Sequence, residues 1–455
     1  MNYSIIPKSQ LEGASRLDAE YYQPEFLKMA NIINANTHEE LRNLSLWIKK
    51  GIFDLSPDNY KDKGIPFIRT LEINDPLIDF SETVFLNQVT HQRNKTTTLI
   101  PGDLVFTKIG AKIGKSSILP SNYNEYNFSQ NVAGVKVRQD IIKSGYLSTF
   151  LLSKFGKVQI DRAQMISGQS KLELEDLRKL KVVLIHEGSQ QKINDLVIDS
   201  QDLKNQSLKF YQHAEELLLK ELGLKDFQAE DDLSYVVNFS DVSEANRIDA
   251  EYFQIKYEKL VEKIRMRNAK QLSELVAMTK GFEPGSEAYQ EEGRLFIRVS
   301  SLSRFGIESS DQKYLNDDLY NKLKSTYEPQ VGEILLTKDA TPGIAHVIKD
   351  PIEGIISGGI MRLKVRDNIN AEYLALCISS IVGKWQAERD AGGSIIAHWK
   401  PEQIKNLLIP ILPIEKQREI AGLVKKSHEA RKKSKELLEE AKRKVEEMIE
   451  KGGGN

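Results

Sequence analysis

Residues Gln190 to Leu222 read QQKINDLVIDSQDLKNQSLKFYQHAEELLLKEL, and Gln417 to Lys451 read QREIAGLVKKSHEARKKSKELLEEAKRKVEEMIEK. In both stretches, apolar and small residues recur at alternating steps of three and four. This spacing leaves an apolar stripe along one side of a helix, as in a coiled-coil seam. The two stretches therefore predict two long helices, each ~50 Å in length at ~1.5 Å of rise per residue.

The two stretches also align with each other at a constant offset of 227 residues, as from Ile193 to Ile420. Small residues fall at the same places in both, such as Ser200 with Ser427, so two helix axes can approach closely. The predicted seam consists of Ile193, Leu196, Leu203, Phe210, Leu217, Ile420, Leu423, Ala430 and Leu437. Two separate amphipathic surface helices are the alternative. We favour helices that pair and act as a spacer, because the residues that precede each one are duplicated as well.

Composition limits the class of protein. A chain of 455 residues is too long for one hydrophobic core. It contains no apolar run of about 18 residues, which predicts no membrane span, and its start lacks a signal-peptide pattern. The single cysteine, Cys377, excludes internal disulfides and fits a reducing cytoplasm. The histidines are scattered without metal-ligand spacing, so no metal site is expected. The net charge of −1 implies that any site for a polyanion is local.

An internal repeat runs through the rest of the chain. GASRLDAEYYQ at residues 13–23 returns as EANRIDAEYFQ at residues 244–254, and PGDLVFTK at 101–108 returns as VGEILLTK at 331–338. GIPFIRTLEI (64–73) matches GRLFIRVSSL (293–302), FSQNVAGVKV (128–137) matches ISGGIMRLKV (356–365), and SGQS (167–170) matches AGGS (391–394). Several matches in the same order indicate two tandem copies of one unit.

Each copy combines short apolar runs between Gly and Pro, typical of strands, with helical spacing at residues 146–163 and 373–390. We therefore predict an α+β fold with two tandem mixed domains on two long helices. The expected divisions are a first domain at 1–185, a first spacer helix at 186–230, a second domain at 231–412, and a second helix with its tail at 413–455.

Catalytic motifs are hard to find. The loop Gly110 to Ser116 resembles a phosphate-binding loop, but three residues separate Gly110 from Gly114 where the motif needs four, and the second copy lacks its Lys-Ser. No methyltransferase tetrapeptide, zinc-protease motif or catalytic triad spacing is present. The sequence thus favours a binding protein, and the basic loop is better interpreted as one that follows a DNA backbone.

Polar and basic residues in the loops are the candidates for DNA contact, because their side chains hold phosphates or read base edges. In the first copy they are Arg69, Lys108, Lys112, Lys115, Ser129, Gln130, Asn131, Gln169, Ser170 and Lys171. In the second copy they are Arg298, Lys338, Thr341, Ser357, Ser394, His398 and Trp399. The two copies share a scaffold but differ at these loops, as two readers of different targets would. Ordinary solvated loops are the alternative.

With these residues in view, the chain resembles a DNA-specificity subunit of a type I restriction–modification system over residues 1 to about 450. The resemblance is carried by the openings R-[LI]-D-A-E-Y-[YF] at Arg16 and Arg247, the strands G-[DE]-[LI]-[VL]-[FL]-T-K at Gly102 and Gly332, and the Gln-containing helix entries at Gln190 and Gln417. No single motif is very specific, but the order of the motifs and their duplication, taken together, are specific.

The resemblance implies a non-catalytic subunit in which each domain reads one half of a split, asymmetric site on double-stranded DNA. It implies two helices packed as an antiparallel coiled coil with pseudo-two-fold symmetry, which fix the spacing of the half-sites. The implied partners are two adenine-methyltransferase subunits and restriction/translocase subunits. S-adenosylmethionine, ATP and magnesium are expected only on those partners, and the location is cytoplasmic.

Two other functions remain open. One is the specificity partner of a different enzyme, such as a fused methyltransferase–nuclease. The other is a duplicated protein-interaction scaffold, for which a steep loss of DNA affinity with salt would be contrary evidence.

Overall fold

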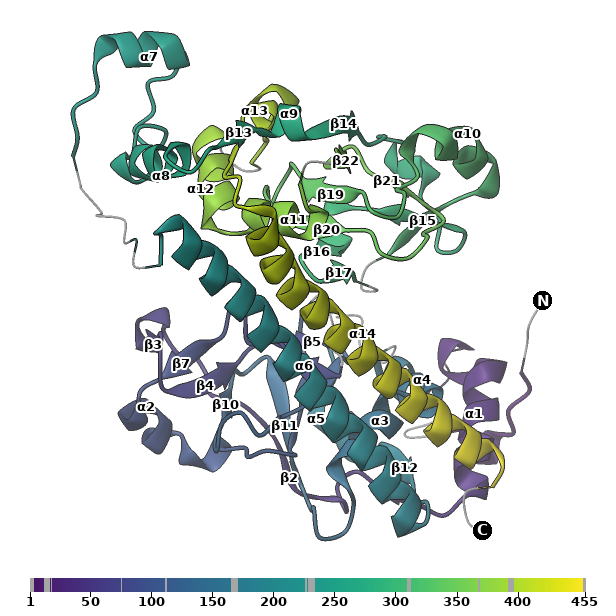
Figure 1. The fold of residues 1–455 in the computed structure, drawn as a ribbon. Coiled ribbons are helices and arrows are strands. Elements are labelled where there is room, and N and C mark those ends of the chain that lie inside the picture. Colours follow the sequence, from purple (N-terminus) through teal and green to yellow (C-terminus); the bar gives the residue numbers. More distant parts are fainter. Residues whose placement is uncertain are drawn as a thin grey trace. The chain divides into compact units, whose positions relative to one another are not determined.

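The computed structural model describes residues 4–11, 17, 19–74, 76–110, 113–164, 171–225, 227, 234–308, 312–366, 369–391 and 397–452. The chain forms two compact units (Figure 1). Unit 1 comprises Met1–Lys204 and Lys432–Asn455, and unit 2 comprises Asn205–Arg431. Each unit thus contains part of both long helices, α6 (Glu187–Leu222) and α14 (Ile414–Glu450). The domain boundaries expected near residues 185, 230 and 412 remain predictions.

Unit 1 is built around two sheets. The larger has the strand order β2-β11-β8-β9-β6-β5, the second has the order β10-β4-β7-β3, and β1 pairs with β12. Its strands are β1 (His38–Glu40), β2 (Ser45–Lys50), β3 (Tyr60–Lys61), β4 (Ile65–Ile68), β5 (Ile73–Asn74), β6 (Leu77–Ile78), β7 (Val84–Leu86), β8 (Leu104–Thr107), β9 (Ser116–Ile118), β10 (Asn127–Phe128), β11 (Val132–Val137) and β12 (Lys181–Val183). Its shorter helices are α1 (Pro24–Ala35), α2 (Gln88–Arg93), α3 (Ser144–Leu152), α4 (Lys154–Gln164) and α5 (Leu174–Arg178).

Unit 2 repeats this plan. The orders β14-β22-β19-β20 and β18-β15-β21 correspond to β2-β11-β8-β9 and β7-β4-β10, including a parallel pair in each smaller sheet. Its strands are β13 (Lys270–Gln271), β14 (Val276–Lys280), β15 (Arg294–Ile297), β16 (Leu302–Ser303), β17 (Gly306–Ile307), β18 (Lys313–Leu315), β19 (Ile334–Thr337), β20 (Ala345–Val347), β21 (Gly354–Ile356), β22 (Ile360–Val365) and β23 (Leu408–Ile409). Its helices are α7 (Phe239–Ala245), α8 (Ile255–Arg265), α9 (Leu272–Leu275), α10 (Asp317–Tyr327), α11 (Ala371–Ser379), α12 (Ile381–Asp390) and α13 (Pro401–Lys405). The predicted α+β fold and its duplication are confirmed.

The helical stretches predicted at 146–163 and 373–390 each form two helices, α3 with α4 and α11 with α12. Glycine permits the sharp break. A Cβ on Gly156 would lie 2.3 Å from the Leu151 carbonyl oxygen, and a Cβ on Gly383 would lie 2.2 Å from that of Ile378. Any side chain at these positions would clash with the preceding helix.

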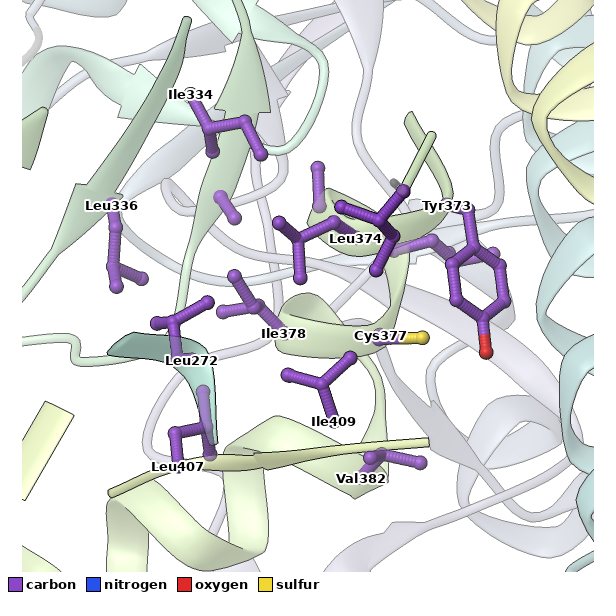
Figure 2. Close-up of a cluster of buried hydrophobic side chains, with 14 of the residues drawn as sticks. Leu272, Ile334, Leu336, Tyr373, Leu374, Cys377, Ile378, Val382, Leu407 and Ile409 are labelled. Carbon is purple, nitrogen blue, oxygen red and sulfur yellow. The ribbon is translucent and has the colours of Figure 1, made fainter. Parts of the chain in front are cut away.

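The core of unit 2 lies between its larger sheet and α11 (Figure 2). Leu272, Ile334, Leu336, Leu374, Ile378 and Ile409 are all buried there. Cys377 points into the same cluster, beside Tyr373, and burial raises the pKa of its thiol to about 12. This cysteine therefore serves as a packing residue.

Both units bring α6 and α14 into close contact through serines. In unit 1, Ser200 Oγ donates to the Ser434 carbonyl at 3.0 Å and Ser434 Oγ donates to the Ser200 carbonyl at 2.8 Å. In unit 2, Ser427 Oγ donates to the Ser207 carbonyl at 2.7 Å. Near the C-terminus of α6, Glu221 forms an ion pair of 3.1 Å with Lys416, which lies near the N-terminus of α14. Residue numbers rise along one helix as they fall along the other, so the pairing is antiparallel.

The most deeply buried stripe of α6 and α14 differs from the predicted seam at seven of its nine positions. Ile193 and Ile420 are buried, but Leu196, Leu203, Phe210, Leu217, Leu423, Ala430 and Leu437 are only half-buried. Val197, Tyr211 and Leu218, each one residue after a predicted position, are buried instead. These side chains belong to the cores of the globular parts. The helices therefore face a globular part as well as each other, which widens the stripe.

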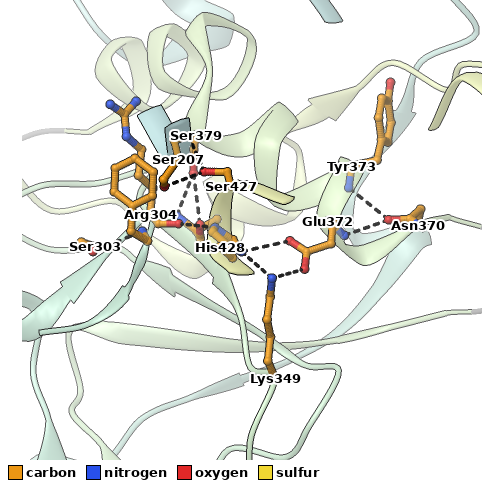
Figure 3. Close-up of polar contacts among 12 residues, drawn as sticks. Ser207, Ser303, Arg304, Lys349, Asn370, Glu372, Tyr373, Ser379, Ser427 and His428 are labelled. Carbon is orange, nitrogen blue, oxygen red and sulfur yellow. Dashed lines mark hydrogen bonds and ion pairs between the residues drawn. The ribbon is translucent and has the colours of Figure 1, made fainter. Parts of the chain in front are cut away.

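Unit 2 holds α14 through a polar network around His428 (Figure 3). The Lys349 ammonium lies 2.5 Å from His428 Nδ1, and His428 Nε2 lies 3.1 Å from the Arg304 carbonyl. Lys349 also forms an ion pair of 3.0 Å with the buried Glu372. A neutral ring with its proton on Nε2 satisfies both contacts of His428.

Replacement of Ser427 by leucine should destabilise the chain by about 1–3 kcal/mol, because the added atoms force apart two closely packed helices. Thermal unfolding would measure the loss. Lys433→Leu, at an exposed position of α14, is the control and should leave the midpoint nearly unchanged. Equal midpoints for the two variants would contradict the close packing.

His428 should make stability depend on pH. Burial lowers the pKa of His428 to about 3, and Lys349 and His346 act in the same direction. Since the folded pKa lies below the ordinary value of about 6.5, the stabilising contribution is complete above pH 6.5 and declines as the pH falls towards 3. Between pH 7 and pH 5 the loss should be about 2 kcal/mol.

The variant His428→Gln carries the residue that the first repeat has at this position, Gln201. Its unfolding midpoint should fall less than that of the unchanged chain between pH 7 and pH 5. An equal fall in both proteins would show that His428 does not titrate on unfolding.

Candidate nucleic-acid interface

In unit 1, three segments of the chain meet where β8 ends. The N–H of Lys108, the residue after β8, donates to the Asn131 carbonyl at 2.9 Å, and the Lys108 carbonyl accepts from the Leu172 N–H at 3.0 Å. Ile109 forms an antiparallel bridge with Lys171. Backbone pairing thus brings together Lys108, Asn131 and Lys171, which were predicted from separate loops. We call this meeting point the unit 1 junction.

The turn between β10 and β11 forms one side of the junction. The Val132 N–H donates to the Ser129 carbonyl at 3.0 Å and closes the turn, while the Ser129 N–H donates to the Ile68 carbonyl at 2.9 Å. Ser129 and Gln130 are half-buried and Asn131 is exposed. The turn therefore presents amide and hydroxyl groups from a fixed backbone.

A glycine lets β2 pass directly against this turn. A Cβ on Gly51 would lie 2.0 Å from the Phe128 carbonyl oxygen. Its counterpart in unit 2 is Gly281, whose Cβ would lie 2.1 Å from the Ser357 carbonyl oxygen. The close approach places Lys50, the last residue of β2, next to the junction.

The junction of unit 1 is locally basic. Lys108 is 7% exposed, and its pKa is lowered by burial and then by the charges of Lys171 and Lys50, although Glu173 opposes them. Lys171 pairs with Glu173 at 2.7 Å. The described residues place no carboxylate within ion-pair distance of Lys108. Three lysines and one nearby carboxylate leave a net positive charge, which suits an anionic ligand.

Arg69 lies beside the junction, but its charge is already compensated. Its guanidinium contacts Glu72 at 2.6 Å, and also donates to the Glu82 carbonyl at 2.7 Å. The hydrogen bond with Glu72, which is almost fully buried, raises the pKa of Arg69. In this conformation Arg69 stabilises the turn after β4 through these two contacts.

The other predicted residues of unit 1 are less well placed or not described. Lys115 is half-buried, and its carbonyl accepts from the Thr107 N–H at 2.8 Å across the β8–β9 hairpin. Lys112, Gln169 and Ser170 lie outside the described residues.

Unit 2 forms the same junction from equivalent residues. The Lys338 N–H donates to the Gly359 carbonyl at 2.9 Å, and the Trp399 N–H donates to the Lys338 carbonyl at 2.8 Å. Asp339 and His398 form the matching antiparallel bridge. Lys338 therefore corresponds to Lys108, Asp339 to Ile109 and His398 to Lys171. We call this meeting point the unit 2 junction.

The unit 2 junction differs in its charges. The Asp339 carboxylate contacts the Lys338 ammonium at 2.5 Å and His398 Nδ1 at 2.8 Å. Burial opposes the ionisation of Asp339, but the hydrogen bonds from Lys338 and His398 outweigh it and lower the pKa of Asp339. The cation equivalent to Lys108 is thus paired within the protein.

The turn after Asp339 has an unusual backbone. Ala340 has a φ of 59°, a left-handed conformation that costs a residue with a Cβ about 1 kcal/mol or more. The Ala340 N–H donates to the Ala397 carbonyl at 3.0 Å, and Thr337 Oγ1 donates to the Thr341 carbonyl at 2.5 Å. Thr341 itself is exposed. These bonds hold the turn that orients Asp339.

Ser357 and Arg298, two further predicted residues of unit 2, lie next to the junction. The Ser357 N–H donates to the Ile297 carbonyl at 2.8 Å, which places the half-buried Arg298 nearby. Ser357 is buried at 7% exposure. Ser394 lies outside the described residues.

Trp399 is only 1% exposed and belongs to the hydrophobic core of unit 2. In this conformation its side chain is too deeply buried to contact DNA. The counterpart in unit 1, Leu172, is buried as well. The position is therefore apolar in both repeats and packs beneath the junction.

Two residues at the junctions were missed from the sequence. Lys50 and Asp339 were not among the candidates. The signal for Asp339 was available, because it replaces Ile109 directly after the repeated T-K of the strand. The repeat alignment, read residue by residue, identifies a charge present in only one copy.

Two kinds of site are absent from the described residues. No helix there is sufficiently long and apolar to cross a bilayer. No group of three or more His, Cys, Asp or Glu residues in the described part is arranged to hold a metal ion.

Trp399→Ala should destabilise unit 2 by about 3–5 kcal/mol, because it leaves a cavity in the core. Trp399→Phe should cost much less. Thermal unfolding of both variants, with DNA binding measured below their midpoints, separates packing from recognition. Loss of DNA binding in a stably folded Trp399→Phe variant would contradict a packing role.

The chain is similar in sequence to known proteins. Residues 268–443 match the family model of the type I restriction modification DNA specificity domain. The chain is 23% identical over 443 residues to a putative type I restriction enzyme MjaX specificity subunit of Methanocaldococcus jannaschii, with 94% of this chain and 97% of that protein covered. These matches confirm the resemblance indicated by the repeated motifs.

Two specificity subunits are among the solved structures that the chain matches. The S subunit of a type I restriction–modification system from M. genitalium is 12% identical, with 91% of this chain and 95% of that chain covered and a TM-score of 0.41. The HsdS subunit from Thermoanaerobacter tengcongensis is 14% identical, with the same coverages and a TM-score of 0.28.

Proposed function

Because residues 268–443 match the type I restriction modification DNA specificity domain and the chain is similar to a type I specificity subunit along almost its whole length, we propose that the chain is a specificity subunit that reads a split, asymmetric DNA site. Unit 1 reads one half of this site through its junction, and unit 2 reads the other half. The specificity-subunit family is non-catalytic, and its methylase and nuclease activities reside on partner subunits.

The observation that carries this proposal is the repeated junction with unequal side chains. Strand β8 and strand β19 end in the same backbone pairing, but Asn131 and Lys171 in one unit are replaced by Gly359 and His398 in the other. A common scaffold with different polar groups is what two readers of different sequences require, since base edges are distinguished by donors and acceptors.

The long helices support the proposed spacing of the half-sites. A helix of 36 residues such as α6 is about 54 Å long, which exceeds one turn of DNA at about 34–36 Å. We propose that α6 and α14 set the number of unread base pairs. The proposed partners are two adenine-methyltransferase subunits and restriction/translocase subunits, with S-adenosylmethionine, ATP and magnesium bound by those partners.

Phosphate binding by the unit 1 junction should appear in the salt dependence of DNA affinity. The assay is titration of the chain, assembled with its methyltransferase subunits, onto a duplex at several salt concentrations. Each phosphate that a cation neutralises adds about 0.9 to the slope of log affinity against log salt. Lys108→Ala together with Lys171→Ala should therefore lower the slope by about 0.9–1.8.

Lys179→Ala is the control, because Lys179 is exposed on the same unit and pairs with Glu175 at 3.8 Å. It should leave the slope unchanged. Binding without any salt dependence in the unchanged complex would instead favour a protein-interaction scaffold. A DNA-dependent complex with a fused methyltransferase–nuclease would identify the other type of enzyme partner.

A further inference from the structure

We propose that Asp339 neutralises the unit 2 junction, so that unit 2 holds the DNA backbone with fewer cations than unit 1. This inference rests on the proposed DNA-reading function and adds a residue that sets the balance between phosphate and base contacts. Asp339 weakens the sequence-independent attachment of unit 2 and leaves its binding more dependent on the matching half-site.

The two junctions allow a comparison position by position. Lys108 follows β8, and its N–H donates to the Asn131 carbonyl in the β10–β11 turn. Lys338 follows β19, and its N–H donates to the Gly359 carbonyl in the β21–β22 turn. The next residue is Ile109 in unit 1, with 37% exposure, and Asp339 in unit 2. A hydrophobic side chain and a carboxylate therefore occupy the same place beside the same lysine.

The carboxylate of Asp339 is fully engaged. One oxygen contacts Lys338 Nζ at 2.5 Å and the other contacts His398 Nδ1 at 2.8 Å. The side chain of Lys338 is 10% exposed and that of Asp339 is 22% exposed, whereas that of His398 is 62% exposed. The pair between Lys338 and Asp339 is thus shielded from water, which makes it stronger than an exposed pair.

Local hydrogen bonds and one left-handed residue fix the backbone around Asp339. The left-handed Ala340 and the bond from its N–H to the Ala397 carbonyl hold the turn. The Thr341 N–H donates back to the Asp339 carbonyl at 2.7 Å. Because this turn fixes the carboxylate between its two partners, Lys338 reaches a phosphate only by leaving Asp339.

The electrostatic consequence is a difference in counterion release. Each lysine that neutralises a phosphate releases counterions and adds about 0.9 to the salt slope. Lys108 is able to contribute in this way, whereas Lys338 is already neutralised. Removal of the Asp339 charge should therefore let Lys338 neutralise one more phosphate, and a carboxylate in place of Ile109 should prevent Lys108 from doing so.

The test uses the full chain with its methyltransferase subunits and a 30-base-pair duplex of fixed arbitrary sequence. Asp339→Asn should steepen the slope of log affinity against log salt by about 0.9, so that lowering salt from 200 to 50 mM favours this variant about 3.5-fold more than the unchanged complex. The double variant Asp339→Asn with Lys338→Ala should return to the original slope. Asp318→Asn, an equal charge change at an exposed position of α10, should have no effect on the slope.

The reciprocal variant Ile109→Asp should lower the slope by about 0.9, whereas Ile141→Asp, at a position with 44% exposure, should not. An unchanged slope in both Asp339→Asn and Ile109→Asp, in a complex whose binding still depends on salt, would overturn this inference and leave the proposed function standing. Binding that is independent of salt in the unchanged complex would overturn both.

Discussion

The close packing of two long helices is the constraint on which the rest of each unit depends. Where α6 and α14 meet, serine hydroxyls lie 2.9 Å apart in unit 1 and 3.1 Å apart in unit 2. Only small side chains permit this approach, and each hydroxyl is satisfied by contacts across the pair. Buried hydroxyls without partners would destabilise the contact.

The helix pair is also part of both hydrophobic cores. Ile193, Val197, Ala441 and Val445 belong to the core of unit 1, and Leu218, Ile420 and Val424 to that of unit 2. The sheets that end in the two junctions share these cores. Within each unit, the junction is therefore rigidly connected to the helices through continuous packing.

Local pairing, rather than total charge, distinguishes the two junctions. The chain as a whole carries a net charge of −1, yet the unit 1 junction collects Lys50, Lys108 and Lys171 around one carboxylate. In unit 2 a single aspartate pairs with the equivalent lysine. Small changes at equivalent positions thus give one scaffold two electrostatic characters.

The sequence predicted the duplication and the long helices well, because both depend on patterns that repeat along the chain. The seam was less accurate: Tyr211 is buried rather than Phe210, since the helix faces a globular core as well as its partner helix. The sequence placed Trp399 in a polar loop, whereas its side chain is packed in the hydrophobic core of unit 2. The role of Asp339 depends on its contact with His398, 59 residues away. No local sequence pattern reveals a contact between residues so far apart.

The most direct test of this account is the adenine methylome of cells that express the chain with its neighbouring methyltransferase. We predict methyl-adenine at a split, asymmetric motif that disappears when the chain is deleted. Exchange of residues 1–185 for those of a relative should change one half of the motif only. A motif that changes in both halves, or a methylome that is unaffected by deletion of the chain, would contradict the assignment of one half-site to each unit.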